Sequence, residues 1–148
     1  MDAGYTNIKL WGNGWSDNEK YREYAMGPAE NGETLSKIYQ ASKIVIGNNI
    51  LTTAAARAWE SMLSGAFYLS NYIPENADIT DIRKVLEEKD YVMFHTKEEL
   101  LEKVSYYLSH EEERLKMVQR GRKAALAKMT YDSLMKRVLD TVAERLEE

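Results

Sequence analysis

Short apolar runs alternate with amphipathic segments over the first 95 residues, and this alternation constrains the fold more than any other feature of the chain. The amphipathic segments predict helices at Glu33–Ser42, Thr53–Ser64 and Ile79–Glu88. The apolar runs predict buried strands at Asn7–Trp11, Lys43–Gly47, Ala66–Leu69 and Tyr91–Phe94, and a further short strand at Tyr24–Gly27. Because strands separated by helices pair in parallel through crossover connections, we predict an α/β fold with a mostly parallel sheet flanked by helices.

The pattern changes to helices alone after residue 95. Thr96 is a helix N-cap residue, and Glu99 three positions later completes a capping box. The helix that follows is expected to end near His110, and a second one begins with the acidic residues Glu111–Glu113. Thr130 caps a third helix with a clear 3.6-residue apolar period. The C-terminal third is therefore predicted to be helical.

The length of 148 residues fits one domain, which we divide into an α/β part at 1–95 and a helical part at 96–148. The absence of cysteine excludes disulfides, zinc–thiolate sites and cysteine nucleophiles, and it suits a cytoplasmic protein. No apolar run is long enough to span a bilayer, and the first eight residues do not resemble a signal peptide. The first strand lies so close to Met1 that we expect the chain to be part of a longer protein.

Charge is distributed unevenly along the chain. Residues 1–113 carry a net charge of -8, whereas residues 114–137 carry +7. This basic segment could contact phosphate, a membrane or nucleic acid, or it could be the solvated face of a helix. No aromatic residue interleaves with the basic ones before Tyr131, which favours the solvated face, and we predict no nucleic-acid partner.

Two glycine-containing loops follow predicted strands, where ligands bind in open α/β sheets. Gly12-Asn13-Gly14 allows backbone amides to approach a phosphate or a sugar, although a plain turn has the same composition. After Gly47, a polar loop leads to a helix whose N-terminus is a potential anion site. Its candidate binding residues are Asn48, Asn49, Thr52 and Thr53.

Arg57 and Glu60 are three residues apart and share one face of the predicted helix. An arginine can neutralise a diphosphate, and a carboxylate can accept hydrogen bonds from both hydroxyls of a ribose. An ordinary ion pair on an exposed face would have the same spacing. His95 and His110 have no nearby pattern of metal ligands or nucleophiles, so we predict neither a metal site nor a catalytic residue.

Four segments together resemble the C-terminal half of group 1 glycosyltransferases, in the branch typified by the spore-maturation protein CgeB. They are LWGNGW, YAMGPAENGETLSKIYQASKIVIG, ARAWESMLSGAFYLSNY and the run from TKEELL to MKRVL, which cover the chain from about Asn7 to Leu139. The resemblance implies one half of a GT-B enzyme, in which two Rossmann-like domains enclose the active site. The C-terminal domain of such enzymes holds the nucleotide-sugar donor.

The resemblance also implies roles for single residues. Glu60 matches the glutamate that binds the nucleotide ribose, Arg57 matches a diphosphate contact, and Gly12–Gly14 match the loop bordering the donor. Thr52 stands where many relatives carry a glutamate that contacts the donor sugar. The implied donor is linked to UDP or GDP, no metal is expected, and the acceptor-binding N-terminal domain is missing. We therefore expect the chain alone to bind a donor without transferring sugar.

Two functions remain open at this point. The first is the nucleotide-sugar-binding domain of a glycosyltransferase with an unknown acceptor, which Arg57 and Glu60 favour. The alternative is a non-catalytic interaction or regulatory module that kept the glycosyltransferase fold, which Thr52 and the small size favour.

Overall fold

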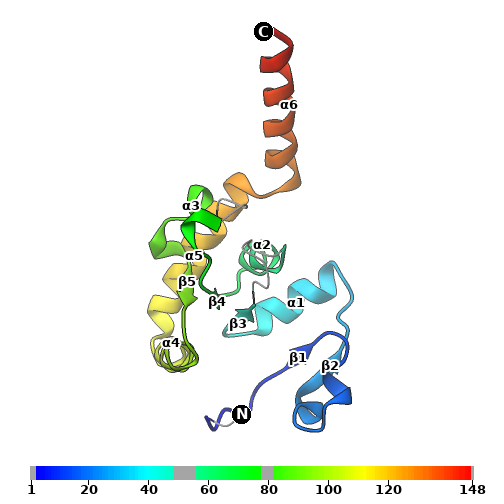
Figure 1. Cartoon of the computed structure of the whole chain (residues 1–148), viewed down its shortest axis with the longest axis vertical. Coiled ribbons are helices and arrows are strands. Elements are labelled where there is room, and N and C mark those ends of the chain that lie inside the picture. Colours follow the sequence, from blue (N-terminus) through cyan, green and yellow to red (C-terminus); the bar gives the residue numbers. More distant parts are fainter. Residues whose placement is uncertain (1–2, 49–55, 78–81, 148) are drawn as a thin grey trace. The chain divides into compact units, whose positions relative to one another are not determined.

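The computed structural model describes residues 3–48, 56–77 and 82–147 (Figure 1). The chain divides into two compact units, Met1–Ile38 and Tyr39–Glu148, and each is described by itself. The single domain expected over residues 1–148 stays a prediction.

The first unit contains a two-stranded parallel sheet. Its elements are β1 (Leu10–Trp11), the 3-10 helices η1 (Trp15–Asp17) and η2 (Arg22–Tyr24), β2 (Ala25–Gly27) and most of α1 (Glu33–Ala41). The backbone N–H of Gly12 donates to the carbonyl of Gly27 at 2.9 Å, which continues the pairing beyond β1. The strand predicted at residues 7–11 is thus confirmed over its last two residues.

The second unit contains a three-stranded parallel sheet in the order β3-β4-β5. Its elements after α1 are β3 (Val45–Gly47), α2 (Ala56–Leu63), β4 (Tyr68–Asn71), η3 (Glu75–Ala77), α3 (Ile82–Val85), η4 (Glu88–Asp90), β5 (Val92–Phe94), α4 (Lys97–Ser109), α5 (Glu111–Lys128) and α6 (Tyr131–Glu147). Because the strands are parallel, their carboxyl ends lie at one edge of this sheet. The predicted α/β class, with a parallel sheet, flanking helices and a helical C-terminal third, is confirmed.

The later start of one predicted strand has a local cause. The strand predicted from Ala66 begins at Tyr68, because Ala66 lies in the turn that follows α2. In this turn the N–H of Ala66 donates to the Ser61 carbonyl and the N–H of Gly65 donates to the Met62 carbonyl, both at 2.9 Å. This pair of bonds is the Schellman arrangement, and Gly65 supplies the positive φ that it requires. Within its described residues, the helix predicted at 79–88 is α-helical over α3.

The hydrophobic core of the second unit lies between the sheet and helices α4 and α5. Phe67, Leu69, Val92 and Met117 form its buried centre, and side chains of α4 and α5 pack around them. Since successive side chains of a strand point to opposite faces, Tyr68 faces away from this cluster. The helix α6 contributes no buried residue, and its exposed apolar side chains are Tyr131, Met135, Val138, Leu139, Val142 and Leu146.

The predicted helix caps are present, with one change in bonding. The Thr96 hydroxyl accepts the backbone N–H of Glu99 at 3.1 Å, as a cap should. The Glu99 carboxylate, however, accepts the N–H of His95 at 2.6 Å, one residue before the expected partner. It also pairs with Lys103 one turn further along, which fixes its position. At the start of α6, the Thr130 hydroxyl accepts the backbone N–H three residues later at 3.2 Å.

Candidate functional site

Arg57 and Glu60 are linked by a third side chain, that of Tyr39. Both charged residues are exposed on α2, whereas Tyr39 is 8% exposed at the end of α1. The Tyr39 hydroxyl hydrogen bonds with each of them, so it accepts from the Arg57 guanidinium and donates to the Glu60 carboxylate. A buried phenol thus holds a cation and an anion in a defined relation on one helix face.

The electrostatics of Tyr39 follow from this position. Burial raises the pKa of its hydroxyl, and the Glu60 carboxylate raises the pKa further, while the Arg57 guanidinium lowers it. The phenol therefore stays protonated at neutral pH, and it can keep donating to Glu60.

Tyr68 brings a second hydroxyl to the same neighbourhood. Its side chain is 4% exposed, and burial raises its pKa to about 12, an effect that the nearby Arg57 charge opposes. The phenol lies against Gly47 at the end of β3, so closely that a Cβ on Gly47 would overlap its hydroxyl. Among the residues that the structure describes, this hydroxyl has no hydrogen-bond partner.

The loop predicted to contribute an anion site is described in part. Asn48 is exposed directly after β3. Asn49, Thr52 and Thr53 lie outside the described residues, and so does the helix N-terminus that was expected to bind a phosphate.

The predicted Gly12-Asn13-Gly14 loop lies in the first unit, whereas Arg57 and Glu60 lie in the second. Gly12 and Gly14 have φ values of +126° and +82°, which is the freedom that the composition predicted. The Gly12 N–H already donates to the Gly27 carbonyl. The structure thus brings together Arg57 and Glu60 among the predicted residues, and it groups this loop with β1 and β2.

Sequence reasoning missed Tyr39 and Tyr68. Both are buried, Tyr39 in α1 and Tyr68 at the start of β4, where an aromatic residue is typical of a hydrophobic core. The available signal was the hydroxyl itself, because a buried tyrosine needs a partner for its polar end. Their relation to Arg57 depends on tertiary packing.

The two histidines form ring contacts. His95 stacks on Tyr72 with ring centroids 4.2 Å apart, and His110 stacks on Tyr106 at 3.9 Å. Within residues 3–48, 56–77 and 82–147, no group of three or more His, Cys, Asp and Glu side chains could hold a metal ion.

A comparison with protein families matches residues 2–140 to a family described as glycosyl transferase-like. The match includes Tyr39, Arg57, Glu60 and Tyr68. The chain belongs to this glycosyl transferase-like family. No curated protein matches the chain. In the described parts of this glycosyl transferase-like domain, no helix is both long and apolar enough to cross a membrane.

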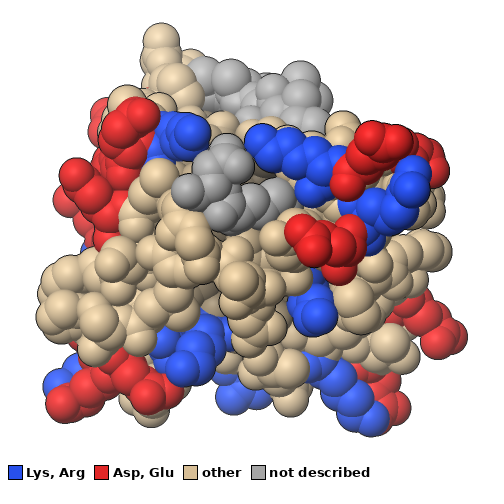
Figure 2. Space-filling view, turned by 90° about the horizontal axis from the view of Figure 1, so that it is seen from below, with Lys and Arg blue, Asp and Glu red and all other residues tan. Residues whose placement is uncertain are grey.

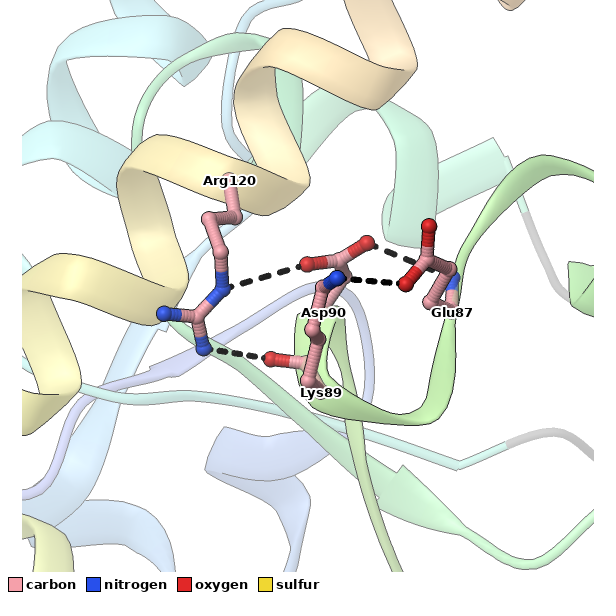
Figure 3. Close-up of polar contacts among 4 residues, drawn as sticks. All are labelled: Glu87, Lys89, Asp90 and Arg120. Atoms are coloured by element: carbon pink, nitrogen blue, oxygen red, sulfur yellow. Dashed lines mark hydrogen bonds and ion pairs between the residues drawn. The ribbon is translucent and has the colours of Figure 1, made fainter.

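The basic segment 114–137 of the glycosyl transferase-like domain makes many contacts within the chain. Arg114 is buried and donates to the Tyr107 carbonyl at 2.8 Å. Arg120 contacts the Asp90 carboxylate at 3.3 Å and the Lys89 carbonyl at 2.7 Å (Figure 3). Four other basic side chains of the segment also donate hydrogen bonds within the chain: Lys116, Arg122, Lys128 and Lys136.

These contacts favour the interpretation of segment 114–137 as helix surface with structural roles. Figure 2 shows Lys and Arg side chains interleaved with Asp and Glu side chains over one face of the molecule. Within segment 114–137, Lys116 pairs with Glu112 and Lys136 pairs with Asp140, so acidic side chains offset part of its basic charge.

Proposed function

We propose that this glycosyl transferase-like domain binds the nucleotide-sugar donor of a glycosyltransferase at Arg57 and Glu60. The observation that carries the proposal is the Tyr39 hydroxyl, which hydrogen bonds with both side chains. Binding needs a cation for the diphosphate and an acceptor for the ribose hydroxyls, and each must keep its position without ligand. A buried phenol between the two supplies that order.

The wider proposal is that the chain forms the C-terminal, donor-binding half of a cytoplasmic GT-B enzyme of the CgeB-like branch. The donor is linked to UDP or GDP, and the acceptor binds to a second domain. Arg57 stabilises the charge that develops on the diphosphate as it leaves, so transfer needs no metal ion. The family match over residues 2–140 supports this proposal.

Calorimetric titration with UDP, GDP and their sugar derivatives tests the binding role. Glu60→Ala should weaken nucleotide binding by about 1.5–3 kcal/mol, the range for a hydrogen bond to a charged group. The matched control is Glu102→Ala, which removes an exposed glutamate from α4 and should leave affinity unchanged. Equal affinity of the Glu60→Ala variant and the wild type would remove Glu60 from the site.

The alternative is a non-catalytic interaction module with the same fold. Thr52, which replaces a glutamate of the resembled family, favours it. The same titration distinguishes the two, since a module that has lost donor chemistry binds neither UDP nor GDP nor their sugars.

We also expect no sugar transfer by the 148-residue chain alone. Arg57 and Glu60 suit the nucleotide side of the reaction, whereas transfer needs an acceptor hydroxyl held in line with the anomeric carbon. An assay with radiolabelled donor and mixed acceptors measures this. Robust transfer would mean that the acceptor site lies within this domain or between copies of it, and would contradict the two-domain proposal.

A further inference from the structure

The Tyr68 hydroxyl is a buried polar group whose partner is missing among the described residues. An unpaired buried hydroxyl destabilises the folded state, so native proteins rarely keep one without a reason. A phenylalanine would fill the same space without that cost. The hydroxyl therefore needs an explanation beyond packing.

The direction of the Tyr68 side chain gives the first part of that explanation. Tyr68 is in register with Val45, yet its hydroxyl contacts Gly47, two residues further along β3. The ring thus leans along the sheet toward the carboxyl ends of the strands. Ligands of open α/β sheets bind at that edge.

The space for this ring comes from Gly47. A Cβ at position 47 would overlap both the hydroxyl and the ring carbon that bears it. The φ of Gly47 is not among the positive values of the described glycines, so its missing side chain matters here as space. A glycine at the end of β3 and a tyrosine at the start of β4 together bring a hydroxyl to the edge.

The neighbours of Tyr68 indicate which part of a ligand it meets. The charges of Arg57 and Tyr39 affect the pKa of the Tyr68 hydroxyl, whereas the Glu60 carboxylate affects the pKa of Tyr39. Tyr68 therefore belongs to the cationic end of the cluster, and Glu60 marks the anionic end. Phosphate oxygens bind at a cationic end, while ribose hydroxyls can donate to a carboxylate.

We propose that the Tyr68 hydroxyl binds a phosphate oxygen of the nucleoside diphosphate, beside the guanidinium of Arg57. The inference rests on the proposed function, which it deepens by dividing the site into a phosphate end and a ribose end. Arg57 supplies the charge, and the phenol supplies a neutral donor that is held in place by Gly47. A bound phosphate oxygen gives the hydroxyl the acceptor that it lacks.

Tyr68→Phe tests the proposal, because it removes the oxygen and keeps the ring against Gly47. Affinities of the wild type and the variant for UDP, UMP and uridine, and for GDP, GMP and guanosine, are measured by calorimetry. We expect diphosphate binding to weaken about tenfold or more, and nucleoside binding to stay unchanged. The control is Tyr107→Phe, which removes a hydroxyl from a tyrosine packed against the hydrophobic core and should change no affinity.

The outcomes separate this proposal from the proposed function. Wild-type affinity of Tyr68→Phe for diphosphates, together with weaker binding by Glu60→Ala, would overturn the inference and leave the proposed function in place. An equal loss for nucleoside and diphosphate would overturn the phosphate assignment. If the wild type binds neither UDP nor GDP, both proposals fail. Thermal unfolding of Tyr68→Phe should begin no lower than that of the wild type, since an unpaired hydroxyl is removed.

Discussion

Replacing Gly121 with alanine tests how α5 is seated on η4. Gly121 is buried, and a Cβ there would lie 2.9 Å from the backbone oxygen of Asp90. The backbone that carries this oxygen is held by a capping box between Glu87 and Asp90, and by hydrogen bonds from Arg120 to the Asp90 carboxylate and the Lys89 carbonyl (Figure 3). Backbone fixed in this way cannot move without breaking some of these bonds.

Two opposing effects decide the sign of the change in stability. Alanine is a better helix former than glycine by about 1 kcal/mol, which would stabilise α5. Forcing a carbon against fixed backbone costs about 1–3 kcal/mol. We expect the second effect to exceed the first, so that Gly121→Ala lowers the free energy of unfolding by about 1 kcal/mol.

Urea unfolding followed by far-ultraviolet circular dichroism measures the difference. The matched control is Ala127→Gly at an exposed position of α5, which should lose about 1 kcal/mol through helix propensity alone. A Gly121→Ala protein as stable as the wild type, or more stable, would refute the argument, because propensity would then outweigh the contact with Asp90.

Three further predictions concern single features of the structure. Burial raises the pKa of the Tyr68 hydroxyl to about 12 in the folded protein, whereas the pKa of an unfolded tyrosine is about 10. Stability should therefore fall as pH rises from 10 to 12, and Tyr68→Phe should remove up to about 3 kcal/mol of that fall in denaturation midpoints measured across the range. Thr96→Ala should cost about 1 kcal/mol of unfolding free energy in urea, and Thr96→Ser should restore it; an unchanged midpoint for alanine would mean that the cap is dispensable. Lys116→Glu combined with Lys123→Glu should leave nucleotide affinity nearly unchanged at about 0.15 M salt, whereas a large loss would make segment 114–137 a ligand footprint.

Much of the secondary structure could be predicted because it depends on local patterns. The apolar run at residues 91–94 became β5, and Thr96 caps α4 as its neighbours in the sequence indicated. The start of β4 could not be predicted in the same way. Ala66 continues the apolar run, but its N–H donates to the Ser61 carbonyl in the turn that ends α2.

The sequence predicted only the part of the candidate site that lies on one helix. Arg57 and Glu60 are three residues apart, so their shared face follows from helix geometry. Tyr39 and Tyr68 come from α1 and β4, and apolar patterning cannot distinguish a tyrosine in a core from one whose hydroxyl meets a charged group. The exposure of the apolar face of α6 could not be predicted for a similar reason. A 3.6-residue period indicates which side chains share a face, but it does not indicate what covers that face.

The fit between Gly47 and Tyr68 makes the effects of substitutions depend on their order. Alanine at position 47 would overlap the ring as well as the hydroxyl of Tyr68, so even phenylalanine at position 68 would not accommodate it. A smaller residue at position 68 must come first, leaving a void that a side chain at position 47 can later fill. The opposite order passes through an overpacked protein. The two positions are therefore epistatic, and a viable mutational path between the two arrangements passes through the protein with glycine at position 47 and the smaller residue at position 68.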